Sequence, residues 1–223
     1  MIELPDFEEA FSYENNFYLS CDITRLSKLL AHYEIFKIAR DCPGEIVECG
    51  VFKGASIARF AMMRSLFGNP HSKKIIGFDI FDHFPEMERE DDVEWRERFI
   101  GFTKGGTSIS PEQLMEVLEH KNVHHNVELV AGDVCETVSA YAEEHPELKI
   151  ALLNMDTGTY ESSLSILEHF YPKVVNGGVV ILDNYSTVAG ETAAVDEYFA
   201  GRKVTYQKFP FSMTPVYLIK DQD

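Results

Sequence analysis

The chain has 223 residues, of which 45% are hydrophobic, and a formal net charge of −17 at pH 7. This length and composition suit one substantial core, so we expect a single domain over residues 1–223. The negative charge disfavours nucleic acid and anionic membranes, no apolar run reaches the roughly 20 residues of a membrane span, and with no leader-like start and no C-x-x-C pair we expect a cytoplasmic protein.

Alternating apolar patterns predict a doubly wound α/β fold. A helix capped by Asp22 should run to about Arg40, so that residues 1–43 form an N-terminal covering region. We expect further helices at 55–67, 111–121, 135–144, 161–172 and 190–200. Buried strands are expected at 46–50, 74–79, 127–132, 149–156 and 178–184, followed by two strands at 203–209 and 216–219. The result is a mostly parallel, seven-stranded sheet with an antiparallel C-terminal edge strand.

The first predicted strand ends in a glycine-containing turn. Glu48 lies at the strand end, Gly50 and Gly54 follow with a spacing of four, and Ser56 stands at the start of the next helix. Such a turn lets the backbone approach a ligand closely at the positive end of a helix. The spacing differs from the dinucleotide pattern G-x-G-x-x-G, so a pyrophosphate is not expected. An ordinary tight turn explains the same residues equally well.

Two further strand ends carry acids that suit a nucleoside. Asp79, with Ile80 beside it, lies 25 residues after Gly54, which is close to the distance at which a strand–helix–strand unit places a carboxylate on a ribose. Asp133 follows the next strand, where it would contact an adenine amino group or cap the following helix. Both interpretations of Asp133 remain open.

The last two parallel strands also end in polar side chains. Asp156 follows one strand, and Asp183 and Asn184 follow the other. Because the carboxyl ends of parallel strands share one edge of the sheet, these oxygen ligands suit a hard divalent cation such as magnesium. The alternative is that both acids only cap helices.

Residues 82–110 form an insertion that is too long for an ordinary strand–helix connection. It follows the strand that ends in Asp79, so we expect it to cover the ligand crevice as a lid. Phe84, Trp95 and Phe99 would supply apolar surface for the flat face of a sugar. The charged run at 86–97 is also typical of a solvated helix face, and the segment would then be decoration or an oligomer contact.

Four segments together resemble the macrocin O-methyltransferase family, which methylates sugar hydroxyls with S-adenosylmethionine. The segments are 47–54, 77–81, 152–160 and 171–185. The resemblance implies a class I, Rossmann-like methyltransferase fold.

The same resemblance implies roles for individual residues. Gly50, Gly54 and Ser56 would surround the methionine end of S-adenosylmethionine, Asp79 would bind its ribose, and Asp133 would lie by its adenine. Asp156 matches the metal ligand and general base.

The chain departs from the family pattern at two positions. Gly158 stands where the pattern Asp-x-Asp-x-Tyr has its second acid, and Asn184 stands where the next strand end has a second acid. Asn184 keeps an oxygen ligand but gives up a negative charge, so magnesium binding by Asp156, Asp183 and Asn184 should be weaker than in a three-carboxylate site. A metal-independent reaction therefore stays open as the alternative.

The expected function is therefore an S-adenosylmethionine-dependent O-methyltransferase assisted by Mg²⁺. The acceptor would be a sugar hydroxyl on a natural-product deoxysugar, a nucleotide sugar or a surface glycan. A catechol-type O-methyltransferase acting on an aromatic diol, and a non-catalytic cofactor-binding subunit, are the alternatives. A homo-oligomer is compatible with the sequence.

Overall fold

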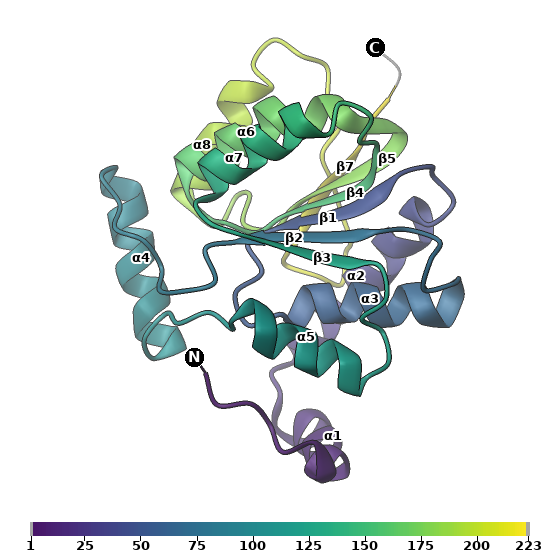
Figure 1. The fold of residues 1–223 in the computed structure, drawn as a ribbon. Coiled ribbons are helices and arrows are strands. Elements are labelled where there is room, and N and C mark those ends of the chain that lie inside the picture. The colour runs from purple at the N-terminus through teal and green to yellow at the C-terminus, as the bar shows by residue number, and fades with distance from the viewer. Residues whose placement is uncertain (1, 222–223) are drawn as a thin grey trace.

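A computed structural model describes residues 2–221. Its centre is a seven-stranded sheet with the order β3-β2-β1-β4-β5-β7-β6 (Figure 1). The strands are β1 (Glu45–Cys49), β2 (Ile75–Asp79), β3 (Val127–Ala131), β4 (Ile150–Met155), β5 (Val174–Leu182), β6 (Gln207–Lys208) and β7 (Val216–Ile219). The first five strands are parallel, and β7 pairs antiparallel with β5 and with β6. The predicted sheet, with its antiparallel C-terminal strand, is confirmed.

Helices cover both faces of the sheet, which gives three layers (Figure 1). One face carries α2 (Ile23–Ala39), α3 (Ala55–Phe67) and α5 (Pro111–His120). The other face carries α6 (Val134–Glu144), α7 (Tyr160–Phe170) and α8 (Ala189–Tyr198). Because strands buried on both faces need apolar side chains on both, the strand sequences are nearly continuous apolar runs.

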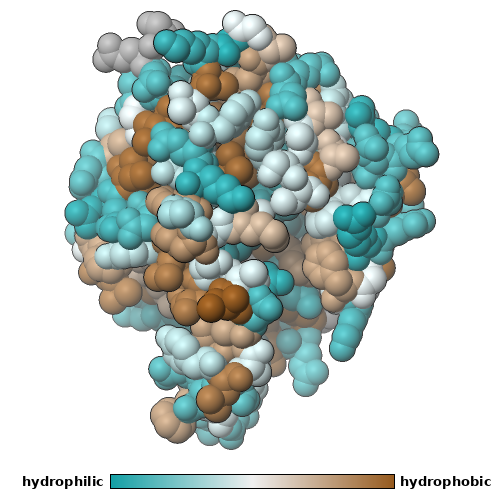
Figure 2. All heavy atoms as spheres, turned by 180° about the vertical axis from the view of Figure 1, so that it is seen from behind, coloured by the Kyte–Doolittle hydropathy of each residue, from teal (hydrophilic) through white to brown (hydrophobic). Residues whose placement is uncertain are grey.

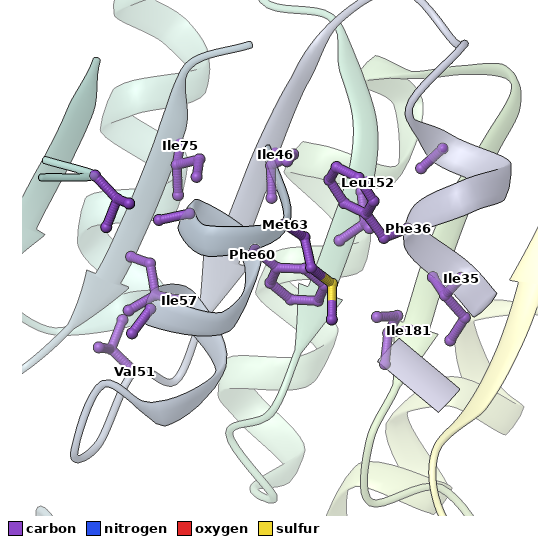
Figure 3. Packing of buried hydrophobic residues seen from close by; sticks show 14 of the residues in the cluster. Ile35, Phe36, Ile46, Val51, Ile57, Phe60, Met63, Ile75, Leu152 and Ile181 are labelled. Carbon is purple, nitrogen blue, oxygen red and sulfur yellow. The ribbon is translucent and has the colours of Figure 1, made fainter. Parts of the chain in front are cut away.

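The hydrophobic core lies on both sides of the sheet. Between the sheet and helices α2 and α3, aliphatic and aromatic side chains interdigitate around Phe36, Phe60 and Leu152 (Figure 3). A second cluster, around Phe78 and Phe170, fills the space under α6, α7 and α8. This packing holds the carboxyl ends of the parallel strands at one fixed edge.

Several elements differ from the sequence-based expectation. Helix α1 (Ala10–Ser20) was not predicted, contains no buried residue and protrudes at the lower end of the molecule (Figures 1 and 2). The insertion contains a helix, α4 (Glu90–Thr103), and short 3₁₀ turns η1 (Phe7–Glu9) and η2 (Tyr171–Lys173) flank other elements. The strand expected at 203–209 shrinks to β6, whose two residues pair with Tyr217 and Val216 of β7. Pro215, which has no N–H to donate, stops the ladder at the Phe209 end only.

Asp22 caps α2 as predicted, since its Oδ1 accepts a hydrogen bond from Thr24 N at 2.9 Å. Across residues 2–221, none of the helices combines the length and apolar character that a membrane span requires.

Candidate active site

A cavity of about 820 Å³ opens at the carboxyl ends of the parallel strands. Its walls come from α2, the turns after β1 to β5, the 82–110 insertion and the loop before β7. Residues that line it from these elements include Lys28, Gly50, Phe52, Asp79, Ile80, Phe84, Asp92, Trp95, Phe99, Asp133, Val134, Cys135, Asp156, Thr157, Asp183, Asn184 and Thr214. The predicted crevice and the predicted lid therefore meet in one site.

Close packing requires glycine at both Gly50 and Gly54 in the turn after β1. Gly50 has φ +93°, and a Cβ at this position would lie 2.2 Å from the carbonyl oxygen of Asp156. Gly54 has φ +77°, and its Cβ would meet Leu114 at 2.6 Å. Only glycine fits such positions without strain. Gly50 lines the cavity, and its backbone packs directly against the strand end that carries Asp156.

Asp79 organises the turn that would face a bound nucleoside. Its Oδ2 accepts hydrogen bonds from the backbone N–H groups of Val51 and Phe52 at 2.8 and 2.9 Å. Its Oδ1 accepts from Phe81 N at 2.7 Å and from the Ser108 hydroxyl at 3.2 Å. Asp79 lies at the cavity as expected, yet four protein donors already bind its carboxylate.

Glu48 and Ser56 form a buried pair behind the cavity wall. The Ser56 hydroxyl donates to Glu48 Oε1 at 2.6 Å, and Glu48 is 0% exposed. Burial raises the pKa of Glu48 to about 8, although the hydrogen bond from Ser56 lowers it. Both residues were expected to contact the cofactor, but neither lines the cavity among the described residues.

Asp133 caps a helix, which is one of the two expectations left open for it, while its contact with an adenine stays a prediction. Its Oδ1 accepts from Cys135 N at 2.8 Å, which caps α6, and the residue also lines the cavity with Val134. Ile80 lines the same region beside Asp79.

Asp156, Asp183 and Asn184 converge as the strand ends predicted. The Asn184 side-chain amide donates to Asp156 Oδ1 at 3.1 Å. Removal from water and the neighbouring Asp183 carboxylate raise the pKa of Asp156. A carboxylate with a raised pKa at the floor of a cavity is suited to accept a proton.

Lys28 of α2 joins these two acids, which sequence reasoning missed. Its Nζ lies 2.6 Å from Asp183 Oδ2 and 3.5 Å from Asp156 Oδ2. Burial lowers the pKa of Lys28, but the two carboxylates raise it by more, so the ammonium stays charged. A lysine on an amphipathic helix normally faces solvent, and the pattern alone gave no signal for this contact.

The expected magnesium site does not fit this arrangement. Mg²⁺ binds oxygen ligands at about 2.0 to 2.1 Å, whereas the Lys28 ammonium already occupies the space between the carboxylates and would repel a second cation. Asn184 turns its N–H, rather than its oxygen, toward Asp156. Within residues 2–221, no group of three or more His, Cys, Asp or Glu side chains is placed to share a metal ion.

Glu191 of α8 was also missed. It is 0% exposed, and its carboxylate accepts from Asn184 N at 2.9 Å, from Asn184 Nδ2 at 3.1 Å and from Gly158 N at 3.1 Å. It thereby ties together the loops after β4 and β5. Its spacing to the buried Ala194 and Val195 places it on the inner face of α8, and an acid in such a position was a usable signal.

The 82–110 insertion closes over the cavity. The Asp92 carboxylate accepts from Tyr160 N at 3.0 Å, and the Trp95 indole packs against Gly158. Phe99 contacts Phe52 of the glycine turn, with 4.8 Å between ring centroids. The lid is thus docked on both the turn after β1 and the loop after Asp156.

Comparison with known proteins gives a consistent result. The sequence profile described as Macrocin-O-methyltransferase (TylF) matches residues 22–220. An 8-demethyl-8-(2,3-dimethoxy-alpha-L-rhamnosyl)-tetracenomycin-C 4'-O-methyltransferase from Streptomyces olivaceus is 26% identical over 160 residues, which cover 71% of this chain and 59% of that protein. A demethyldecarbamoylnovobiocin O-methyltransferase from Streptomyces niveus is 26% identical over 166 residues, which cover 73% and 61% of the two chains.

The crystal structure of CalS11, a calicheamicin methyltransferase, superposes with a TM-score of 0.79 at 29% identity. The match covers 97% of this chain and 86% of that one. The chain therefore matches most of the length of a solved relative, but only about three fifths of the two Streptomyces enzymes.

Proposed function

This chain belongs to the macrocin O-methyltransferase family, and from that premise we propose that it transfers a methyl group from S-adenosylmethionine to a sugar hydroxyl. One observation carries the proposal. Gly50 of the glycine turn, the acids Asp79 and Asp133, and Asp156 all line a single cavity beneath the 82–110 insertion.

The cavity suits S-adenosylmethionine in size and charge. Its volume of about 820 Å³ lies in the range of small-molecule sites, roughly 300 to 1,000 Å³. When bound, this cofactor supplies a methyl group on a positively charged sulfur. Acidic side chains outnumber basic ones in the cavity wall, so the wall favours a cation. Gly50 lets the first turn approach the cofactor, while Asp79 holds that turn through the N–H groups of Val51 and Phe52.

Asp156 serves as the general base in this proposal. Methyl transfer forms a bond between the acceptor oxygen and the methyl carbon, and the acceptor hydroxyl must lose its proton as this bond forms. Asp156 lines the cavity with its side chain 27% exposed, so a hydroxyl can reach it. Asn184 orients the carboxylate from its Oδ1 side. Placement of the two reactants in one closed cavity supplies much of the remaining rate enhancement.

The lid supplies the surface for a sugar acceptor. Phe84, Trp95, Phe99 and Phe102 line the cavity from residues 82–110. Aromatic faces bind the apolar face of a sugar ring, while the nearby acids and hydroxyls accept its polar groups. The name of the S. olivaceus relative specifies a rhamnosyl tetracenomycin, which supports a deoxysugar on a natural product as the acceptor class.

Magnesium assistance has no part in this proposal. The donor set of Asp156, Asp183 and Asn184 favoured it in the sequence, but the Lys28 ammonium stands between the two carboxylates. A divalent ion could use those oxygens only after Lys28 moved away.

Calorimetry and radiolabel transfer test the function. We expect S-adenosylhomocysteine to bind, and NAD not to bind. Labelled methyl groups should reach nucleotide deoxysugars or glycosides in a panel that also holds catechols. Asp156→Asn should keep cofactor-product binding and slow transfer by about 100-fold or more, whereas Asp82→Asn, at an exposed position, should change neither binding nor transfer.

Transfer to catechols alone would overturn the sugar acceptor and favour an aromatic diol. Tight cofactor binding without transfer to any class would indicate a non-catalytic subunit. Absence of cofactor binding would refute the proposal as a whole.

A further inference from the structure

We propose that Lys28 is the resident cation of this acceptor site, and that its ammonium group holds Asp156 and Asp183 in the arrangement for which the chain would otherwise need a divalent metal ion. The inference rests on the proposed methyl transfer. It concerns which group neutralises and positions the carboxylates of Asp156 and Asp183, which the proposed function leaves open.

The position of Lys28 carries the proposal. Its Nζ lies 2.6 Å from Asp183 Oδ2 and 3.5 Å from Asp156 Oδ2, so one ammonium group bridges the acids at two strand ends. The Lys28 side chain is only 22% exposed, and Asp183 only 6%. A lysine held at this depth has given up most of its hydration, and such burial is stable only where opposite charges compensate for it.

The two carboxylates need a positive charge. They face one cavity, and like charges at short range in a partly dry site repel strongly. Asp183 Oδ1 is buried and makes no hydrogen bond within residues 2–221, so Oδ2 and its contact with Lys28 stabilise this side chain. Loss of the ammonium would remove the close counter-charge of this acid pair and leave only the longer-range interaction with Arg59.

Asn184 fits a lysine-centred site better than a metal-centred one. An aspartate in its place would add a third negative charge, which a single ammonium would not balance. Glu191 accepts hydrogen bonds from both the backbone N–H and the side-chain N–H of Asn184, at 2.9 and 3.1 Å. This pair of contacts fixes the amide so that it donates to Asp156 Oδ1. Asp156 thus receives one donor from Asn184 and has Lys28 as its ion-pair partner, while Arg59 interacts with it from farther away.

Lys28 is a positioning residue in this view. It acts on the acceptor through Asp156, which it keeps close to Asp183, and it supplies the positive charge beside the proton-accepting carboxylate. The contact also joins the N-terminal covering helix to the carboxyl end of β5, so α2 takes part in the site as well as in the core.

Binding of Mn²⁺, followed by the electron paramagnetic resonance signal of the free ion, tests the proposal without any methyl transfer. The three proteins are the parent, Lys28→Ala and Lys37→Ala, all saturated with S-adenosylhomocysteine. Lys37 is the matched control, because it lies on the same helix and pairs with Glu34 at the surface. We expect Lys28→Ala to bind one Mn²⁺ at least about 10-fold more tightly than the other two, since it vacates the cation position.

Activity gives a second readout where transfer is measurable. The parent should keep full turnover after treatment with EDTA. Lys28→Ala should lose about 10- to 100-fold in kcat, with recovery on addition of Mg²⁺, Mn²⁺ or methylammonium, and with little change in acceptor KM. Circular dichroism and retained cofactor-product binding verify that the variant is folded.

Two results would overturn the proposal. One is stoichiometric Mn²⁺ binding by the parent that Asp183→Asn abolishes, because the metal would then share the site with Lys28. The other is a folded Lys28→Ala that neither binds Mn²⁺ more tightly nor loses turnover. The Mn²⁺ measurement stands even if no acceptor is methylated, so failure of the proposed function is seen separately.

Discussion

Asp92 on α4 accepts a hydrogen bond from the backbone N–H of Tyr160 at the first turn of α7, with 3.0 Å between Oδ2 and N. Thr159, the N-cap residue of α7, makes no side-chain capping bond of its own. A carboxylate at this position satisfies a free N–H group and interacts favourably with the helix dipole. The lid is therefore docked by capping a helix that belongs to the main body of the protein.

Loss of this contact should release the lid. Asp92→Ala is expected to remove about 0.5 to 2 kcal/mol of docking free energy, the usual cost of losing a helix cap. Hydrogen exchange over residues 90–103 should then accelerate, and acceptor KM should rise while cofactor-product binding persists. Glu94→Ala, at an exposed position of the same helix, is the control and should change neither. Unchanged exchange in Asp92→Ala would show that other contacts hold α4.

Gly158 should control the position of Trp95. It has φ +72°, and a Cβ there would lie 2.4 Å from Trp95 Nε1. Gly158→Ala should displace the indole, and since Trp95 is the only tryptophan of the chain, its fluorescence should shift to the red and acceptor binding should weaken. Gly201→Ala separates steric clash from backbone strain, because Gly201 has φ +75° and nothing within 4 Å of its Cβ position. A red shift in both variants would attribute the effect to strain.

Asp79 should matter for the fold of the cofactor turn as well as for affinity. Its carboxylate accepts from the N–H groups of Val51, Phe52 and Phe81 and from the Ser108 hydroxyl, so Asp79→Ala leaves four donors unpaired. We expect a lower Tm together with a loss of about 1.5 to 3 kcal/mol in the binding of S-adenosylhomocysteine. Calorimetry and thermal melts measure the two effects, with Asp82→Ala as an exposed control. Weaker binding with an unchanged Tm would mean that Asp79 acts mainly as a ribose ligand.

Glu48 should make the folded protein less stable as pH rises. Burial raises the pKa of Glu48 to about 8, whereas the unfolded chain should have a value of roughly 4.3. Between about pH 5 and pH 7 the folded state holds one proton that the unfolded state has lost, so the free energy of unfolding falls by about 1.4 kcal/mol per pH unit from this group.

Glu48→Gln removes that contribution. Urea denaturation across this range should show a flatter pH dependence in the variant than in the parent, while Glu34→Gln at the surface should follow the parent. A slope that is the same in all three proteins would show that Glu48 is ionised in the folded state.

The sequence predicted the framework of the site well. The apolar runs that stop in Gly50, Asp79, Asp133, Asp156 and Asp183 are real strand ends, because parallel strands buried on both faces leave a clear pattern. Their convergence follows from topology alone. The length of residues 82–110 also predicted an insertion beyond an ordinary strand–helix connection, and residues from it line the cavity. Its action as a lid stays a prediction.

Contacts between distant helices were not predictable. Lys28 and Glu191 lie on helices whose patterns place them only approximately, and their partners are set by how each helix packs on the sheet. The magnesium ion was expected for the same reason. Asp156, Asp183 and Asn184 suit a metal ion only if the contact of Lys28 with the two acids is unknown. Helix α1 buries none of its residues, so no apolar periodicity marked it.

The ion pair between Lys28 and Asp183 joins positions 155 residues apart. At a synthesis rate of about 5 to 20 residues per second, Asp183 is therefore added to the chain on the order of ten to thirty seconds after Lys28. The emerging N-terminal half contains Lys28 but neither Asp156 nor Asp183, so the ion pair can form only when β4 and β5 join the sheet. Any circular permutation that opens the loop after β5 would have to rebuild this pair.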